Sequence, residues 1–179
     1  MRIGIEATSI SNRSGTGYYT QKLIQFLGRA DSENEYVLFC PRGYERSLER
    51  PGMFQYPNFT IEQVSAYTRA GQVFWRQFSL PRLSEKHKLD VIHYPAFIAS
   101  LRTDHPSVLT VHDLCFSLFP ETFSRLRRPY YGYMIPRSIR HCNSIIVDSN
   151  ATRRDLQKHF AKKEGWLDTV HLGVDPLFF

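Results

Sequence analysis

The sequence has no apolar run that approaches ~18 residues, the length at which a run becomes a candidate membrane-spanning helix. Its N-terminal stretch, MRIGIEATSI, reaches Glu6 after a very short apolar segment, so we expect neither a signal peptide nor a transmembrane helix. Cysteine is scarce, and Cys40, Cys115 and Cys142 are too far apart for a metal-binding knuckle or a disulfide framework. These absences predict a protein of the reducing cytoplasm.

Two common nucleotide-binding fingerprints are missing. No Gly-Lys-Ser or Gly-Lys-Thr occurs, which excludes a P-loop. A nicotinamide-binding fingerprint needs glycines directly after a strand, a third glycine three residues after the second, and an acid ending the next strand. Here the glycines at 15 and 17 come well after Thr8, Thr20 takes the place of the third glycine, and the second strand ends in FCPRG. Acidic and histidine residues also lack metal-ligand spacing, so we expect no metal and no other cofactor.

What the chain does have is an adequate core and an excess of positive charge. Its 179 residues are 42% hydrophobic, enough for one sizeable core but too few for two typical domains. The formal net charge is +6 and the pI is about 9.3. Such a balance indicates an anionic partner, which can be nucleic acid, a lipid surface or a phosphorylated small molecule.

Short apolar runs alternate with longer amphipathic stretches along the chain. The predicted strands are Arg2–Ala7, Tyr36–Cys40, Phe59–Val64, Val91–Tyr94, Val108–Val111, Ser144–Asp148 and Thr169–Leu172. The predicted helices are Gly17–Arg29, a Phe74–Leu83 region interrupted near Pro81, Arg127–Cys142, and a helix from its N-cap Ser149 to Phe160. Several strands are continuously apolar, as in a parallel sheet covered on both faces. The alternation predicts a single α/β domain with a doubly wound parallel sheet.

Polar residues follow several of these strands directly. The stretch SVLTVHDLCF runs from a buried strand into His112 and Asp113, and the same pattern marks Thr8, Pro95–Phe97 and Ser149. Ligands of open parallel sheets bind beyond the carboxyl ends of the strands. We therefore expect these residues to converge on one edge of the sheet.

The loop SISNRSGTGYY carries a second candidate site. Gly15, Thr16 and Gly17 lie at the start of the first predicted helix. Glycines there let the backbone approach a ligand, and exposed amides at a helix N-terminus attract phosphate. The alternative is that the two glycines only shape a turn.

Several segments in order, MRIGIEATSI, GTGYYTQKLIQFL, VLTVHDLCFSLFPETFSRLRRPYY, SIIVDSNATRRDL and VHLGVDPLFF, resemble the N-terminal domain of glycosyltransferase family 4, the retaining nucleotide-sugar transferases of GT-B architecture. The resemblance spans the chain. The His-Asp pair followed by an aromatic and Pro-Glu is most similar to mannosyltransferase-type members that build bacterial surface polysaccharides. The family resemblance implies that residues 1–172 form a Rossmann-like, acceptor-side domain. Residues 173–179 would begin the linker to a C-terminal donor-binding domain that we do not expect in this chain.

The resemblance implies a retaining transferase of polysaccharide biosynthesis. It would move a sugar, with mannose as the candidate, from a nucleotide-sugar to a glycan or lipid-linked acceptor, and this chain alone would be inactive. Gly15, Thr16 and Gly17 would lie near the donor diphosphate, and His112 would face the transferred sugar as the catalytic residue. A neutral imidazole can donate or accept a hydrogen bond near pH 7, and groups of this kind contribute ~10²–10⁴ in rate.

Other polar residues receive weaker assignments. The alternative for His112 is a structural cap at the end of its strand. We expect Asp113 to hold the His112 loop through backbone hydrogen bonds and Ser149 to be first a helix cap and second a ligand contact. Glu6 stands where an aspartate is common in the family, and no role is assigned to it. The remaining histidines are interpreted as surface or core residues, with His93 the one to re-examine.

Two rival classes share some of these features. A non-catalytic nucleotide- or glycan-binding domain would have the same fold and glycine loop but would not need a reactive His112. A nucleic-acid binder fits the positive charge and the segment SRLRRPYYGYMIPRSIRH, but no nucleic-acid recognition motif is present, so we expect no nucleic-acid partner.

That basic segment has no acidic residue between Glu121 and Asp148. Its members are Arg125, Arg127, Arg128, Arg137 and Arg140, with Tyr130, Tyr131, Tyr133, Met134 and Ile135 among them. One interpretation is contact with an anionic membrane, which predicts Tyr130 exposed beside at least two arginines and a protein peripheral to the inner face of the membrane. The other is an ordinary amphipathic helix with its aromatics turned inward.

Overall fold

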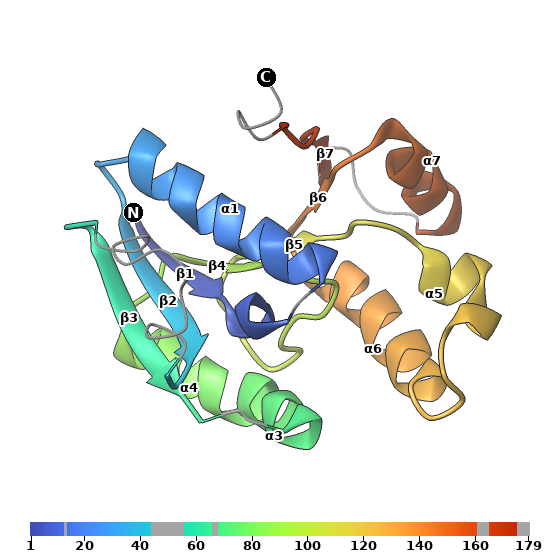
Figure 1. Ribbon diagram of the computed structural model, residues 1–179, viewed down its shortest axis with the longest axis horizontal. Coiled ribbons are helices and arrows are strands. Elements are labelled where there is room, and N and C mark those ends of the chain that lie inside the picture. Colours follow the sequence, from blue (N-terminus) through green and yellow to red (C-terminus); the bar gives the residue numbers. More distant parts are fainter. Residues whose placement is uncertain (13, 44–55, 66–67, 161–164, 175–179) are drawn as a thin grey trace.

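The computed structural model describes residues 1–12, 14–43, 56–65, 68–160 and 165–174, and every structural statement below concerns these residues. They form one parallel sheet with the strand order β3-β2-β1-β4-β5-β6-β7 (Figure 1). The strands are β1 (Arg2–Glu6), β2 (Glu35–Pro41), β3 (Phe59–Val64), β4 (Val91–Tyr94), β5 (Ser107–Thr110), β6 (Ser144–Val147) and β7 (Leu167–Thr169). All the strand pairs are parallel. The predicted doubly wound sheet is confirmed.

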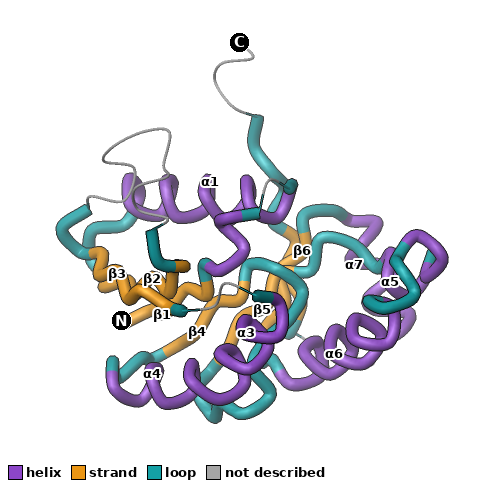
Figure 2. The backbone as a smooth tube through the Cα atoms, turned by 60° about the horizontal axis from the view of Figure 1, so that its bottom comes forward, coloured by secondary structure: helices purple, strands orange, loops and turns teal. Residues whose placement is uncertain are grey.

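Helices connect the strands and cover the sheet. They are α1 (Gly15–Ala30), α3 (Arg69–Phe74), α4 (Leu80–Lys86), α5 (Cys115–Leu118), α6 (Arg128–His141) and α7 (Asn150–His159). Single 3-10 turns span Thr8–Ser11 and Pro120–Thr122. Figure 2 shows α1 on one side of the sheet and α3, α4 and α6 on the other. This is the two-layer covering that right-handed crossovers produce when the strand order reverses direction.

The two faces of the sheet bury separate apolar clusters. On the α1 side, Ile5, Ile24 and Leu38 are completely buried. On the opposite side the larger cluster joins strand residues such as Leu109 to helix residues such as Ile139. Strand β2 is buried at six consecutive positions because it contributes to both clusters. Its continuous apolar sequence follows from this two-sided burial.

Two details of the predicted elements were wrong. The helical region before β4 is not interrupted at Pro81, because α3 continues through a π-helical turn (Trp75–Ser79) into α4, where Pro81 is in the first turn. The wider turn ends just before the proline, where the ordinary hydrogen-bond ladder is already broken. Strand β7 ends at Thr169, whereas Thr169–Leu172 was predicted. Its register on β6 buries Leu167, and Leu172 is exposed.

The sheet changes winding direction between β1 and β4. Strand β1 pairs with β2 on one side and with β4 on the other, and the next strands follow outward from each. This is the switch point at which open α/β sheets leave a crevice beyond the carboxyl ends of their strands. The segments after β1, β4, β5 and β6 therefore meet at one edge.

Candidate functional site

His112 lies at that edge, two residues beyond β5, and its imidazole is held on both sides. Nδ1 lies 3.1 Å from Asp148 Oδ2, and Nε2 lies 3.1 Å from the backbone oxygen of Pro95. The side chain of His112 is only 14% exposed. The contacts come from the ends of β6 and β4, so the strands on either side of β5 fix the orientation of the ring.

Aromatic side chains form the walls around His112. The ring of Tyr19, from the second turn of α1, meets it edge-on at a centroid distance of 4.7 Å, and Phe97 does so at 5.3 Å. Phe97 has a φ of +56°, a conformation that is rare for a bulky residue. Its N–H donates to the Thr110 carbonyl, which helps to hold the strained backbone in place. Backbone strain of this kind concentrates at functional sites.

A second histidine lies behind the first. His93 Nε2 is 2.9 Å from Thr110 Oγ1, and the Tyr19 hydroxyl is 3.4 Å from the same oxygen. Burial, aided by the nearby His112, lowers the pKa of His93 to about 4. Burial also raises the pKa of Tyr19. Near pH 7, His93 is therefore a neutral hydrogen-bonding group.

The glycine loop has a definite local structure. Ser14 is the N-cap of α1, and its hydroxyl accepts from the Gly17 N–H at 3.4 Å. A Cβ on Gly17 would lie 2.0 Å from the backbone oxygen of Asn12, so only glycine fits there. At Gly15 no heavy atom lies within 4 Å of a Cβ position. Gly17 thus shapes the turn, while Gly15 presents exposed backbone at the N-terminus of α1.

The structure links the glycine loop to His112 through Tyr19. No hydrogen bond joins Gly15 or Thr16 to the histidine within the described residues, but Tyr19 follows them on the same helix and contacts the His112 ring. The Thr20 hydroxyl donates to the Thr16 carbonyl at 2.8 Å and lies 2.8 Å from Ser9 Oγ. The first turns of α1 are therefore tied both to the β1 end and to the histidine.

Glu6, which had no role assigned from the sequence, ends β1 in a buried ion pair. Its Oε2 lies 3.3 Å from Arg76 Nη2, and the two side chains are 1% and 10% exposed. The Thr8 hydroxyl donates to Glu6 as well. Burial alone would lower the pKa of Arg76, but Glu6 and neighbouring tyrosines outweigh it, so the pKa is raised. Arg76 comes from the π-helical turn, which therefore supplies the partner of Glu6.

Asp113 and Ser149 make local backbone contacts. Asp113 Oδ1 accepts from the Cys115 N–H at 2.8 Å, which fastens the start of α5 directly after His112. Ser149 is the N-cap of α7, as predicted, and accepts from the Thr152 N–H at 3.1 Å. The Thr152 hydroxyl in turn donates to the backbone oxygen of His112 at 2.9 Å. Ser149 thereby reaches His112 through Thr152, whereas Asp113 does not contact the imidazole.

The basic segment is divided between core and surface. Met134 and Ile135 are buried, and Tyr130 and Tyr131 are half-buried against the core, so the expected exposure of Tyr130 is wrong. Tyr133 is exposed, and the Arg137 guanidinium lies 3.5 Å from its ring centroid. Arg125, Leu126, Arg127, Arg128 and Arg140 of the segment are also exposed, as are Leu118 and Phe119, which precede it.

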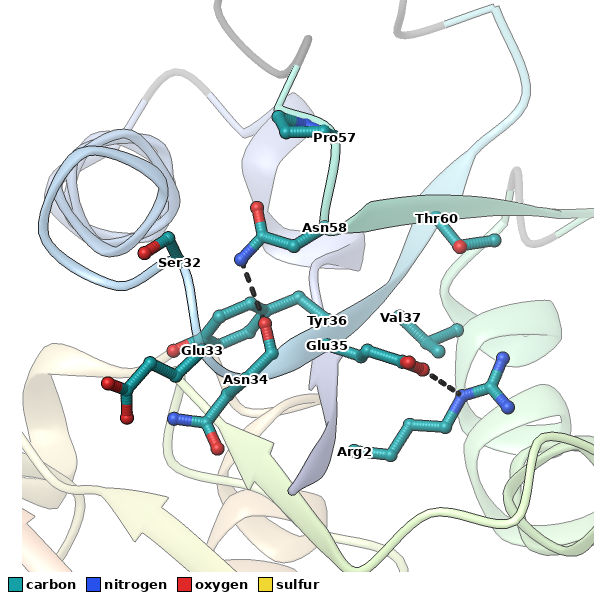
Figure 3. Close-up of a pocket in the computed structure, with 10 residues that line it drawn as sticks. All are labelled: Arg2, Ser32, Glu33, Asn34, Glu35, Tyr36, Val37, Pro57, Asn58 and Thr60. Atoms are coloured by element: carbon teal, nitrogen blue, oxygen red, sulfur yellow. Dashed lines mark hydrogen bonds and ion pairs between the residues drawn. The ribbon is translucent and has the colours of Figure 1, made fainter.

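A cavity of about 560 Å³ opens at the other end of the sheet (Figure 3). It lies at the amino ends of the first strands, between the turn that carries Asn34 and the segment around Asn58, whose side-chain amide donates to the Asn34 carbonyl at 2.8 Å. Arg2 and Glu35 pair along one side at 3.5 Å. None of the predicted site residues lines this cavity.

Two further features concern the described part of the chain only. No three histidine, cysteine, aspartate or glutamate side chains gather there in a way that could hold a metal ion. No helix in these ranges combines the length and the hydrophobicity needed to cross a membrane.

The parallel sheet, its switch point and the polar residues at its carboxyl edge define a Rossmann-like domain. It corresponds to half of a GT-B glycosyltransferase: the apo form of the lipopolysaccharide outer core galactosyltransferase WaaB superposes on 97% of this chain with a TM-score of 0.56. Sequence identity to that protein is 9%, so the likeness shows the fold, and the chain spans 46% of its length.

The sequence pattern of Glycosyltransferase Family 4 matches residues 13–177, and the chain therefore belongs to this family. No curated protein is significantly similar to it in sequence. Members of the family use nucleotide-sugar donors, which fits an exposed glycine loop at the N-terminus of α1.

Two site residues escaped the sequence analysis. Asp148 was predicted only as the end of a strand, although the rule that marked Ser149 applies equally to it. Tyr19 lies in the predicted helix Gly17–Arg29, and no local pattern distinguishes it from a core residue. Both were missed because their role depends on contact with His112, which is 36 residues from Asp148.

Proposed function

We propose that this chain is the acceptor-side half of a retaining glycosyltransferase that moves a sugar from a nucleotide-sugar to a glycan or lipid-linked acceptor. The observation that carries the proposal is the placement of His112 and the glycine loop at one carboxyl edge of the sheet, joined through Tyr19, in a chain of Glycosyltransferase Family 4. A crevice at the switch point of a parallel sheet is where such folds bind ligands.

The residues take the following roles in this proposal. The exposed backbone at Gly15 and Thr16 faces the donor diphosphate, where the positive end of the α1 dipole favours negative charge. Gly17 keeps the loop in the shape that permits this. His112 faces the transferred sugar as the catalytic residue. Asp113 and Ser149 support its loop through the backbone contacts described above.

We further propose that residues 1–172 act with a separate donor-binding domain, to which residues 173–179 begin the linker. Of this linker, Gly173 and Val174 are described and exposed, and 175–179 lie outside the described residues. The purified chain should then transfer no sugar by itself, whereas the two-domain enzyme should. Turnover of a nucleotide-sugar by the chain alone would contradict this division. A two-domain protein that binds nucleotide-sugar but never transfers it would favour the non-catalytic binding domain.

Mannose is the transferred sugar that we propose, from the similarity of the HDLCFSLFPE stretch to mannosyltransferase-type members. Galactose is the sugar named for WaaB, a protein only 9% identical to this chain. Side-by-side assays of the two-domain enzyme with mannose and galactose nucleotide-sugars distinguish them. Faster transfer of galactose would overturn the mannose assignment and leave the enzyme class intact.

We also propose that the enzyme works in the cytoplasm and docks on the anionic inner face of the membrane. Tyr130 itself packs against the core, so the support comes from its neighbours: the exposed apolar residues of the α5–α6 surface lie among exposed arginines, and Leu126 is 91% exposed. We define this surface as Leu118, Phe119, Arg125, Leu126, Arg127, Arg128, Tyr133 and Arg137. Apolar side chains at headgroup depth and arginines on phosphates are the two contributions that bind proteins to such membranes.

Sedimentation with vesicles tests the membrane proposal. The protein should pellet with anionic phosphatidylglycerol vesicles at low salt and not with neutral phosphatidylcholine vesicles. Leu126→Asp should weaken the binding, whereas Phe74→Asp, at an exposed phenylalanine outside the α5–α6 surface, should not. Equally negligible binding to both vesicle types would remove the membrane from the account and leave the acceptor soluble.

A further inference from the structure

We infer that Asp148 is the positioning residue of His112, and that it fixes the hydrogen of the imidazole on Nδ1. The two side chains follow the ends of neighbouring strands. Strands β5 and β6 pair in register through Thr110 and Ile146, and two residues further on each segment reaches the same edge of the sheet. Asp148 Oδ2 lies 3.1 Å from Nδ1, and its side chain is 17% exposed. The inference deepens the proposed function, since it rests on a role for His112 in sugar transfer.

The assignment of the hydrogen follows from the chemistry of the partner. An ionised carboxylate has no hydrogen to give, so a hydrogen bond to Asp148 exists only when Nδ1 carries the hydrogen. The other ring nitrogen faces the Pro95 carbonyl at 3.1 Å, which also can only accept. Both contacts are hydrogen bonds when the ring is an imidazolium. The neutral ring that keeps Asp148 gives up the hydrogen bond to Pro95, because its Nε2 then carries a lone pair, which can accept from a sugar hydroxyl.

The backbone of His112 is held by the same β6–α7 connection. Thr152 donates its hydroxyl to the His112 carbonyl at 2.9 Å and is itself anchored at the helix cap, where its hydroxyl lies 2.9 Å from Ser149 Oγ. The segment 148–152 therefore holds His112 at two places, the ring through Asp148 and the main chain through Thr152. This double attachment distinguishes Asp148 from a chance surface neighbour.

Among the described neighbours of the His112 ring, Asp148 is the one whose carboxylate contacts the imidazole. Tyr19 and Phe97 meet the imidazole in T-shaped ring contacts, and His93 is turned to Thr110. The carboxylate of the other nearby acid, Asp113, accepts a hydrogen bond from the Cys115 N–H. Among the described contacts of His112, Asp148 therefore supplies the negative charge and sets the tautomer, as carboxylates do for reactive histidines elsewhere.

Nitrogen NMR of the histidine-labelled chain tests the positioning directly. The His112 signals are identified by their loss in His112→Gln. In the unmodified chain, Nδ1 of His112 should show a bound hydrogen that exchanges slowly with water. Asp148→Asn and Asp148→Ala should abolish that slow exchange, and Asp113→Asn, the matched neighbouring acid, should preserve it. Unchanged His112 Nδ1 signals in both Asp148 variants would overturn the inference.

Kinetics of the two-domain enzyme separate this inference from the proposed function. Asp148→Asn should lower kcat about tenfold to a hundredfold, the loss seen when partners that orient metal-bound histidines are removed, with KM for the donor nearly unchanged. The double variant Asp148→Asn with His112→Gln should have the same kcat as His112→Gln alone. If His112→Gln keeps full kcat, the proposed role of His112 fails, while the NMR result still judges the positioning. If only His112→Gln lowers kcat, the positioning inference is wrong and the proposed function stands.

Discussion

Glu6 and Arg76 form a buried ion pair at the carboxyl end of β1, with 3.3 Å between Oε2 and Nη2. The residues are 70 positions apart, and Arg76 reaches the sheet from a π-helical turn. A buried pair adds little net stability over apolar residues of the same size, but removal of one partner leaves an uncompensated charge in the interior. The pair therefore makes the β1 end sensitive to single substitutions.

We predict that Glu6→Leu lowers the free energy of unfolding by about 3–5 kcal/mol, because Arg76 loses its charge partner. Urea denaturation of the chain measures the change. The control is the double variant Glu6→Leu with Arg76→Met, which should recover most of the loss because neither charge remains. If the loss of unfolding free energy in the double variant equals the sum of the losses in the two single variants, the two residues do not act as a pair.

The glycine loop offers a matched pair of substitutions. Gly17→Ala should displace the loop and destabilise the chain by about 1–3 kcal/mol, the usual cost of overpacking, because its Cβ would meet the Asn12 carbonyl oxygen at 2.0 Å. Gly15→Ala should leave stability nearly unchanged, since its Cβ enters open space. Thermal unfolding of both variants is the measurement. Equal stability of the two would mean that Gly17 does not shape the turn.

His93 should make the stability of the chain depend on pH. Its pKa falls from 6.5 to about 4 in the folded state, so the unfolded chain binds the proton first as the pH drops. The contribution of His93 to the free energy of unfolding is therefore complete above pH 6.5. It is lost as the pH falls to about 4, and the loss is at most about 3 kcal/mol.

The corresponding measurement is the urea midpoint of the chain between pH 7 and 4. His93→Gln, which keeps an amide near Thr110, should flatten the curve over this window. His159→Gln serves as the control for replacing a histidine at the surface. A His93→Gln variant with the unmodified pH dependence would show that His93 takes up its proton without cost in the folded chain.

The fold was largely accessible from the sequence because its signals are local. Continuous apolar runs such as that of β2 reflect burial on both faces, and Ser149 marked the start of α7 through its capping chemistry. The π-helical turn before Pro81 was not accessible, since its hydrogen-bond pattern depends on how Trp75 and Arg76 are buried. Strand β7 was misplaced because its ends are set by pairing with β6 and not by hydrophobicity.

The site was predictable only in part for a related reason. The carboxyl-edge rule located His112, but the partners of His112 depend on the register of three strands. Asp148 and Pro95 reach the imidazole from 36 and 17 residues away. The expected exposure of Tyr130 failed similarly, because Tyr130 packs beside Arg76, and that arginine is fixed by Glu6 on another element.

In the proposed function, His112 acts in sugar transfer at the carboxyl edge of this sheet. The most direct test is kcat of the two-domain enzyme with His112→Ala, measured together with its melting temperature. We predict a fall in kcat of about 10² or more, within the range for positioned acid–base groups, in an enzyme that stays folded at the assay temperature although the loss of the Asp148 partner lowers its stability by about 1–3 kcal/mol. A variant that melts earlier but keeps its normal kcat would contradict the claim and make His112 a structural residue of the strand end.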